Sequence, residues 1–329
     1  MRVLAVTNMW PRPDRPAFGT FVQSQMESVR SLGVDVHIHV IPGDRGAAAY
    51  ATHVPQVRSA VRRLRPHVVH AHFGLSGWTS RWQPAPLVVS YCGDDLLGAP
   101  APGGGITAKS RLAIRMSLQA ARRADAIVCK SRNLVAALER EMDRHRAVVI
   151  PNGVDTARFR PGVRAAARHR LGLPPRTRLI LFPHDPAQAL QKRFDLAAAA
   201  VAELQKTRPE ATLLHVSGVP PVEMPDYYRA ADCLLLTSRT EGSPNVVKEA
   251  LASGLPVVTV DVGDVRYWLD RVTGCEIAAA EPAAIAAAIG RVLDRDAAVD
   301  PSPVMPDLDR MTAAKKLLGV YESVKGRKR

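Results

Sequence analysis

The sequence has few aromatic residues and no long apolar run. Phe, Trp and Tyr make up 5% of its 329 residues, and no stretch approaches the ~18 apolar residues of a membrane-spanning helix. Without aromatic platforms or a recognisable binding motif, a nucleic-acid partner is not expected. The N-terminus lacks the apolar core and small-residue cleavage site of a signal peptide, so we expect a cytoplasmic protein.

Cysteine and several catalytic signatures are also scarce. The four cysteines lie far apart without a C-x-x-C pair, which predicts buried free thiols rather than disulfides or a metal site. No G-x-S-x-G, Walker loop or H-E-x-x-H occurs. Residues 7–20 contain a single glycine where a nicotinamide-dependent dehydrogenase needs G-x-G-x-x-G, which argues against that class.

Positive charge, by contrast, is abundant. Forty-five basic residues face 31 acidic ones, which gives a net charge of +14. Such a field suits phosphorylated ligands or an anionic membrane. The Ala- and Arg-rich composition of a high-GC genome would produce the same charge, so both explanations stay open.

Apolar strand-like runs alternate with helical patterns along the chain. Because such strands are buried on both faces, the alternation predicts an α/β fold with parallel sheets, and the length favours two domains. The expected strands are residues 3–7, 34–41, 67–71, 87–91, 126–129 and 147–150, then 178–182, 212–216, 233–236, 257–260 and 276–278. The expected helices are 19–32, 55–64, 108–124, 132–141, 193–206, 244–253, 282–293 and 309–324, with a loop at 42–52 and a turn-rich linker at 151–162.

The most informative stretch is residues 232–261, which reads as strand, loop, short helix, turn and strand. Ser243 is expected as the N-cap and Pro244 as the first helical residue. A helix that starts at the carboxyl end of a strand binds anions through its free N–H groups. Glu241 and Glu249 bracket this helix start, eight positions apart. The arrangement predicts a phosphate flanked by polyhydroxyl groups, as in a sugar nucleotide.

Other candidate site residues follow the ends of expected strands. Gly19 ends the loop after the first strand, Asp94 and Asp95 follow the fourth, and Lys192 and Arg193 follow the first strand of the second series. We interpret them as ligand contacts, and the two cations as a clamp on a diphosphate. Each also has an ordinary structural explanation as a helix cap or a solvated helix start.

Three histidines lie around one strand end, at positions 67, 70 and 72. Alternate strand residues face opposite sides, which separates His67 from His70 and His72. Structural or polar roles are therefore favoured over a metal site. Asp261 and Asp264, with Gly263 between them, follow the strand expected at 257–260 and add polar side chains to the same edge as the short helix.

The sequence EGSPNVVKEA at 241–250, followed by GLPVV at 254–258, resembles the E-x7-E region of retaining glycosyltransferases of family four, which have the GT-B fold. The resemblance continues through 262–265, PNGVD at 151–155, 70–72, 90–96 and 124–131. It implies two Rossmann-like domains facing across a cleft. The first, acceptor-side domain comprises 1–155 with a terminal helix at 309–329 that crosses back to it. The second, nucleotide-sugar-binding domain comprises 163–308.

The resemblance implies a retaining transfer of a hexosyl-type unit, of EC class 2.4, without metal or other cofactor. The donor is a nucleotide-diphosphate sugar, and the acceptor is a hydroxyl of a glycan, a glycolipid or other lipid-linked acceptor, or a small molecule, as in cell-envelope polysaccharide synthesis. Glu241, Lys192 and Asp94 are the expected catalytic residues. The expected donor-binding residues are Gly19, Cys92, Arg193, Gly242, Ser243, Pro244, Asn245, Val246 and Glu249, with Glu249 on the ribose.

The chain departs from the family pattern at two places. Cys92 precedes Gly93 where members often have His, and the stretch 185–188 lacks the arginine that many members place before the lysine. Gln188 or His184 then occupies that place, and Arg193 is a candidate substitute. Two alternatives stay open. One is a sugar-nucleotide epimerase of similar fold, and the other is a degenerate sugar-nucleotide-binding protein, which these departures favour.

A further candidate partner is the anionic surface on the inner face of the membrane, to which the protein would bind peripherally. Basic residues of the first domain suggest it, although solvated helix faces explain them as well. They are Arg58, Arg62, Arg63, Lys109, Arg111, Arg115, Arg122 and Arg123.

Overall fold

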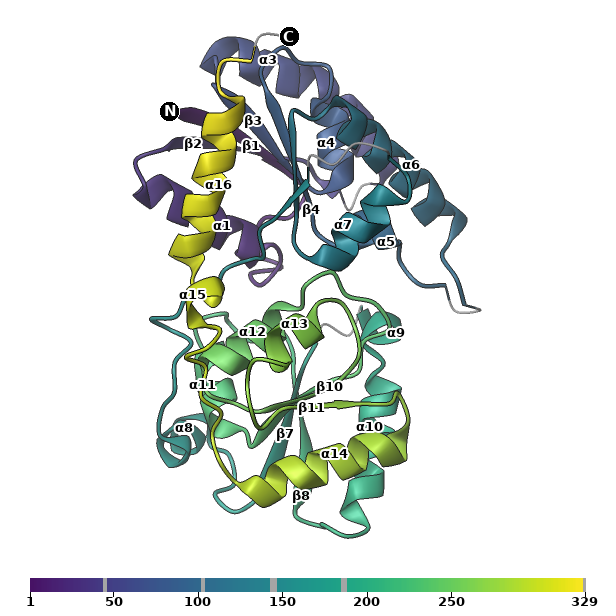
Figure 1. Ribbon diagram of the computed structural model, residues 1–329, viewed down its shortest axis with the longest axis vertical. Coiled ribbons are helices and arrows are strands. Elements are labelled where there is room, and N and C mark those ends of the chain that lie inside the picture. Colours follow the sequence, from purple (N-terminus) through teal and green to yellow (C-terminus); the bar gives the residue numbers. More distant parts are fainter. Residues whose placement is uncertain (44–45, 102–103, 143–146, 185–187, 328–329) are drawn as a thin grey trace. The chain divides into compact units, whose positions relative to one another are not determined.

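The structure is a computed structural model that describes residues 1–43, 46–101, 104–142, 147–184 and 188–327. Contacts divide the chain into two compact units, Met1–Gly153 with Arg310–Arg329, and Val154–Asp309 (Figure 1). Each unit is built on one parallel sheet with helices packed on it. The α/β prediction of two Rossmann-like domains is confirmed.

The sheet of the first unit has six strands in the order β2-β1-β3-β4-β5-β6. Every neighbouring pair is parallel. The strand order reverses between β1 and β3, which is where open α/β sheets bind ligands at their carboxyl edge. The strands are β1 (Arg2–Thr7), β2 (Asp35–Val40), β3 (Val68–His72), β4 (Leu87–Tyr91), β5 (Ala126–Cys129) and β6 (Ala147–Val149).

Helices of the first unit cover its sheet. They are α1 (Thr20–Ser31), α2 (Ala47–Thr52), α3 (Val54–Leu64), α4 (Gly74–Ser80), α5 (Asp94–Leu97), α6 (Ala108–Arg123), α7 (Arg132–Glu139) and α16 (Arg310–Val324). The predicted loop at 42–52 is wrong in its second half, which forms α2. Alanine is the strongest helix former, and the burial of Ala49 and Tyr50 anchors this short helix.

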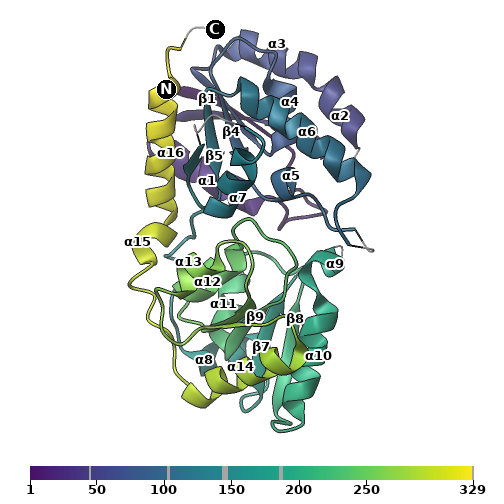
Figure 2. The same ribbon diagram turned by 45° about the vertical axis from the view of Figure 1, so that its right-hand side comes forward.

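The terminal helix α16 belongs to the first unit, as expected. It packs against α1 (Figures 1 and 2), and its Leu317, Tyr321 and Val324 join a core that includes Val22 and Met26 of α1. The Tyr321 hydroxyl also forms a buried hydrogen bond of 2.6 Å with His70 Nδ1 of β3. A residue from the end of the chain thus completes the interior of the first unit.

The sheet of the second unit has five parallel strands in the order β11-β10-β9-β7-β8, and its order reverses between β7 and β9. The strands are β7 (Arg178–Pro183), β8 (Ala211–Val216), β9 (Cys233–Leu236), β10 (Val257–Val260) and β11 (Glu276–Ala278). The helices are α8 (Arg164–Leu171), α9 (Ala189–Lys192), α10 (Phe194–Gln205), α11 (Met224–Ala230), α12 (Asn245–Ala252), α13 (Val265–Leu269), α14 (Pro282–Arg295) and α15 (Met305–Leu308).

Most of the stretch predicted as a linker, 151–162, packs into the second unit. Val154 N donates to Leu308 O at 2.7 Å, and Val154 and Phe159 are buried in the core of this unit. The turn-rich sequence of this stretch gave no sign that Val154 and Phe159 would be buried. None of the helices in the described ranges combines the length and apolarity that a bilayer-spanning segment needs.

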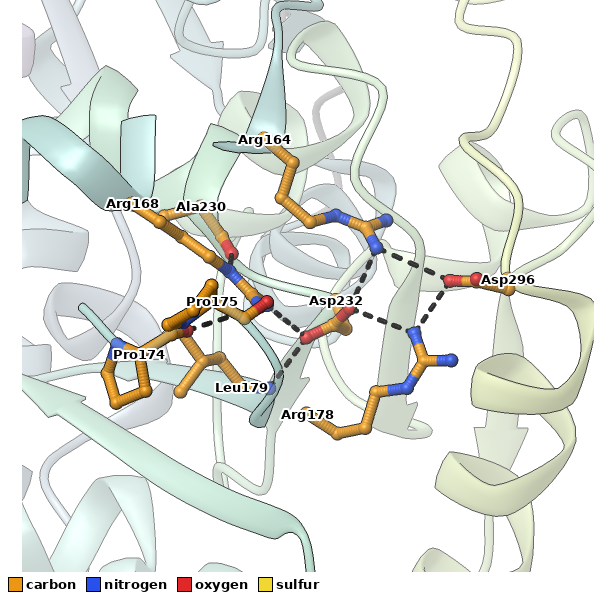
Figure 3. Close-up of polar contacts among 9 residues, drawn as sticks. All are labelled: Arg164, Arg168, Pro174, Pro175, Arg178, Leu179, Ala230, Asp232 and Asp296. Atoms are coloured by element: carbon orange, nitrogen blue, oxygen red, sulfur yellow. Dashed lines mark hydrogen bonds and ion pairs between the residues drawn. The ribbon is translucent and has the colours of Figure 1, made fainter. Parts of the chain in front are cut away.

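A buried carboxylate holds the amino ends of β7 and β9 together (Figure 3). Asp232, just before β9, accepts hydrogen bonds from Leu179 N of β7 at 2.6 Å and from Arg168 Nη2 at 2.7 Å. Its other oxygen lies near the guanidinium groups of Arg164 and Arg178, which also reach Asp296. The network fixes the two strands that the second unit places on either side of its switch point.

We predict that Asp232→Asn strongly destabilises the second unit. The substitution keeps the shape of the side chain but leaves the buried Arg168 guanidinium without a counter-charge, which typically costs about 3–5 kcal/mol. Urea unfolding would measure the loss. Asp294→Asn, which breaks an exposed ion pair with Arg208, is the matched control and should cost under ~1 kcal/mol. Equal losses in the two variants would contradict the structural role of Asp232.

Candidate functional site

The predicted site residues of the second unit gather at the carboxyl edge of its sheet, at the switch point between β7 and β9. Lys192 ends α9, which follows β7, and Glu241 lies in the loop that follows β9. Lys192 Nζ lies 2.5 Å from Glu241 Oε1, and the two side chains are only 16% and 11% exposed. The pair is therefore largely shielded from water, where its charges interact more strongly than on an open surface.

Hydrogen bonds join the two loops that carry this pair. Gln191 Nε2 donates to Thr240 O at 3.1 Å, and Arg239 N donates to Gln191 O at 2.8 Å. Thr237 Oγ1 donates to the carbonyl of Lys192 at 2.8 Å and contacts that of Arg193 at 3.0 Å. Backbone contacts, and not the ion pair alone, thus determine where the ammonium and the carboxylate meet.

The short helix α12 begins beside this pair. Its N-cap is Pro244, so the prediction of Ser243 as N-cap and Pro244 as first helical residue is wrong. The Ser243 hydroxyl instead accepts a hydrogen bond of 3.1 Å from Lys248 Nζ, one turn further along the chain. Pro244 has no side-chain group that could cap α12, and the helix starts at the carboxyl edge of the sheet, as an anion site requires.

Lys248 was not predicted as a site residue, yet its side chain is fully buried under the loop. A buried ammonium favours negative charge nearby. Asp264 lies within its field: burial raises the pKa of this carboxyl, and the Lys248 charge opposes that rise. No sequence signal distinguishes Lys248 from a solvated helix lysine, because its burial depends on the loop folding over it.

Glu249 accepts a hydrogen bond of 2.7 Å from the hydroxyl of Tyr228 in α11. Burial raises the pKa of Glu249 to about 7, while the Tyr228 hydrogen bond and the charges of Lys248 and Arg158 oppose that rise. Tyr228 is buried against Phe159 and was missed by the sequence, since no spacing connects α11 with α12. The hydroxyl fixes the orientation of the carboxylate at one end of the site.

Gly263, in the loop after β10, packs closely against the same site. Its φ of +63° is left-handed, and a Cβ atom there would lie 3.1 Å from Glu241 Cβ and 3.1 Å from Gly242 O. A larger residue would push the Glu241 loop away. The three loops after β7, β9 and β10 therefore form one packed rim at the carboxyl edge of this sheet.

The predicted residues of the first unit lie at the carboxyl edge of their own sheet. Gly19, with a left-handed φ of +77°, is the N-cap of α1, and a Cβ atom there would lie 2.3 Å from the backbone carbon of Met9. Its conformation is therefore required by the fold of the loop.

Arg193, in the second unit, also has a left-handed backbone conformation (φ 54°) and joins α9 to α10.

The two carboxylates after β4 differ in their surroundings. Asp94 is exposed, whereas Asp95 is buried and accepts hydrogen bonds from the backbone N–H groups of Gly74, Cys92 and Gly93. Burial raises the pKa of Asp95 to about 6 even though these hydrogen bonds lower it. Asp95 thus holds the turn. Burial likewise raises the pKa of the Cys92 thiol to about 12, so this group is neutral at physiological pH.

A buried polar cluster at the end of β3 was only partly predicted. His70 uses both ring nitrogens, with Tyr321 and with Ser90 Oγ at 2.7 Å, and its ring centroid lies 4.0 Å from that of His72. Lys130, which the sequence did not single out, is buried nearby, with Nζ 3.4 Å from Gln25 Oε1. Burial and the Lys130 charge lower the pKa of both histidines, so they are neutral.

His67 is apart from this cluster, as predicted. It precedes β3, is exposed, and its Nδ1 accepts a hydrogen bond from Arg2 N. The family departure at 185–188 falls mainly on residues 185–187, which lie outside the described residues. On either side, His184 stacks on Phe194 with an interplanar angle of 11°, and Gln188 is exposed at the N-cap of α9.

Comparison with known proteins gives two family matches. The family model Glycosyltransferase Family 4 matches residues 2–158, and Glycosyl transferases group 1 matches residues 188–295. A D-inositol 3-phosphate glycosyltransferase of Xylanimonas cellulosilytica is 35% identical over 269 residues, which cover 70% of this chain and 64% of the relative. The putative teichuronic acid biosynthesis glycosyltransferase TuaC of Bacillus subtilis is 24% identical, over 80% of this chain and 82% of the relative.

A solved structure shares the fold. That of Anabaena HepE in complex with UDP superposes with a TM-score of 0.68 at 16% identity, and the match covers 98% of this chain and 100% of that one. The chain spans 64%, 59% and 59% of the length of the first inositol-phosphate relatives. The two family matches lie on the two units that carry the sites described above. The chain belongs to the glycosyltransferases of the family 4 type.

Proposed function

We propose that the chain is a retaining, metal-independent glycosyltransferase that moves a hexosyl unit from a nucleotide-diphosphate sugar to an acceptor hydroxyl. The observation that carries this proposal is the shielded Lys192–Glu241 pair beside the start of α12. It combines an ammonium and backbone N–H groups for a diphosphate with a carboxylate for sugar hydroxyls. The family matches and the UDP in the HepE structure support a nucleotide donor.

In the proposed reaction the bond between the anomeric carbon and the diphosphate oxygen breaks, and the acceptor oxygen attacks the same face. The leaving phosphate takes the acceptor proton, so no side chain has to act as the base. Charge develops on the diphosphate as the bond breaks. The Lys192 ammonium and the N–H groups at the start of α12 stabilise that charge, which is the usual source of the largest rate effect.

Glu241 has two parts in this proposal. Its carboxylate holds Lys192 at 2.5 Å before the donor binds, and it accepts hydrogen bonds from the donor sugar afterwards. An arriving diphosphate then competes for the ammonium, which releases Glu241 toward the sugar. Glu249, oriented by Tyr228, accepts hydrogen bonds from the ribose hydroxyls. The names of the relatives favour an acceptor that is a phosphorylated polyol or a cell-envelope glycan.

We predict that Glu241→Gln and Lys192→Met each lower turnover of the nucleotide sugar about 10²–10³-fold, because each removes charge stabilisation at the reacting centre. Release of the nucleoside diphosphate, measured with a panel of uridine, guanosine and adenosine diphosphate sugars, would give the rates. Glu203→Gln, at an exposed carboxylate paired with Lys206, is the control and should leave the rate unchanged.

The same panel separates the proposal from its two alternatives. Donor turnover without an acceptor, with an epimeric sugar as product, would indicate an epimerase. Thermal stabilisation by a uridine or guanosine compound without any turnover would indicate a binding protein. If no nucleotide sugar raises the melting temperature, the proposed function is wrong.

We predict a pH-dependent effect at Glu249. The pKa of Glu249 in the folded protein is about 7, above its ordinary value of 4.5, so ionisation opposes folding and stability falls as the pH rises through that interval. The free energy of unfolding of Glu249→Gln, taken relative to that of wild type, should therefore rise by on the order of 1–3 kcal/mol between about pH 5 and about pH 8.

Urea unfolding at the two pH values would measure this change, with Glu203→Gln as a control that should show none. Glu249→Gln should at the same time weaken stabilisation by UDP, since the amide is a poorer acceptor for ribose hydroxyls. A variant that binds UDP as wild type does would remove Glu249 from the nucleotide site.

We also propose that α4 and α6 of the first unit contact an anionic membrane. The two helices pack side by side (Figure 2), and the basic residues of α6 are exposed. Trp82, after α4, is 41% exposed and Leu112 of α6 is 56% exposed. The Arg81 guanidinium stacks 3.9 Å above the Trp82 ring. Exposed tryptophan with arginine suits a lipid interface.

Flotation with phosphatidylglycerol vesicles at low salt should therefore recover the protein, and phosphatidylcholine vesicles should not. Arg111→Gln should weaken binding about fivefold, because each cation near the surface contributes ~1 kcal/mol. Trp82→Ala should weaken it as well. The matched controls are Arg176→Gln and Val222→Ala, exposed residues of the second unit, and should have no effect. Equal recovery with both kinds of vesicle, or with neither, would contradict membrane docking by charge.

A further inference from the structure

The first unit contains a pocket that none of the predicted site residues lines. It has a volume of ≈ 320 Å³ and lies between the loop after β1 and the end of β2. Among its lining residues are Asn8, Trp10, Arg12, Arg15, Phe18 and Gly43. The volume is in the range of small-molecule sites, and two guanidinium groups with two aromatic rings give the pocket a definite chemistry.

The loop that forms one wall has a defined shape. Arg15 N donates to Arg12 O at 3.0 Å and Arg12 N donates to Arg15 O at 3.3 Å. The two arginines are therefore the paired end residues of one tight turn. Three prolines, at 11, 13 and 16, restrict the backbone around this turn. The close approach of Gly19 to Met9 fixes the end of the loop. The pocket therefore exists without a large loop rearrangement.

The opposite wall is equally close-packed. A Cβ atom on Gly43 would lie 2.6 Å from the Tyr50 hydroxyl and 3.0 Å from Asn8 Cβ. The Arg15 guanidinium stacks on the Phe18 ring at 4.6 Å, which restricts its orientation. Arginine in such a setting binds carboxylate or phosphate through two parallel hydrogen bonds.

Position connects this pocket with the proposed reaction. It lies at the carboxyl edge of the first sheet, where β1 ends, and Gly19 closes the loop that forms it. Ligands of open α/β sheets bind at this edge. Trp10 and Phe18 provide apolar faces for a sugar or polyol ring, and the arginines provide charge for an acidic substituent of that ring.

We propose that this arginine pocket binds the acidic group, carboxylate or phosphate, of an anionic sugar or polyol that serves as the acceptor. The assignment to an acceptor rests on the proposed function, whereas binding of the anion does not. Asp14 lies close to the guanidinium of Arg12, with Oδ1 3.6 Å from Nε, and its side chain is 70% exposed. A bound anion competes with this carboxylate, so Asp14 weakens the site.

The test uses glucose, glucuronate and glucose 6-phosphate as matched probes, titrated into the 329-residue chain and followed by calorimetry and NMR. Glucuronate or glucose 6-phosphate should bind at least about tenfold more tightly than glucose, since charge-assisted hydrogen bonds are the stronger ones. The comparison of the two acids shows whether the pocket prefers carboxylate or phosphate.

Variants assign the binding to the pocket. Arg12→Gln and Arg15→Gln should each weaken the acidic probe about tenfold, and Asp14→Asn should strengthen it about two- to fivefold. Arg58→Gln, which removes an exposed charge on α3 outside this pocket, should leave the affinity unchanged. The gain expected for Asp14→Asn does not depend on a destabilising change, so it tests the proposal even if an arginine variant folds poorly.

Stabilisation by UDP is measured on the same samples. If UDP stabilises the protein but the acids bind no better than glucose, or if Arg12→Gln and Arg15→Gln behave as Arg58→Gln does, the pocket proposal is overturned and the donor proposal stands. If the acids bind as described and UDP does not stabilise the protein, the pocket stands as an anion site and the acceptor assignment is overturned.

Discussion

The parallel pairing of β7 with β9 is the constraint on which the second unit depends. At the amino edge, buried Asp232 joins Leu179 N of β7 to the start of β9 and neutralises Arg168. At the carboxyl edge, the loops that leave the same two strands bring Lys192 to Glu241. Because a parallel sheet places all its carboxyl ends on one side, fixing the register at one edge determines which loops meet at the other.

Three ionisable side chains near that carboxyl edge lie in surroundings that disfavour their charged forms. Lys248 is fully buried, Glu249 has its pKa raised to about 7 by burial, and burial also raises the pKa of Asp264. Burying such groups is costly even where they are hydrogen-bonded, as Lys248 is to Ser243 and Glu249 is to Tyr228. Groups with perturbed pKa values cluster at functional sites, which agrees with the site proposed at this edge.

Sequence reasoning succeeded where one stretch of chain contains the whole pattern. The bounds of β4, β5, β9, β10 and β11 were predicted as found, since short apolar runs between turns are local signals. It failed where contacts join distant segments. The Ser243 hydroxyl binds Lys248 instead of capping α12, and Tyr228 reaches Glu249 from another helix. Likewise, adjacent Asp94 and Asp95 look alike in sequence, and only the fold shows that Asp95 is the buried one.

The first unit combines an interior fixed by side chains with a loop whose turn is fixed by the backbone. Its interior is fixed by long-range contacts, such as Tyr321 of α16 with His70 of β3, which tolerate little change. The loop after β1 is different: its turn is held by backbone hydrogen bonds between Arg12 and Arg15, so the side chains there are not needed to form it. Replacing the Arg12 or Arg15 side chain leaves these two backbone hydrogen bonds in place. In the proposed function, acceptor preference resides in those side chains, and the E-x7-E pattern in the second unit does not predict it.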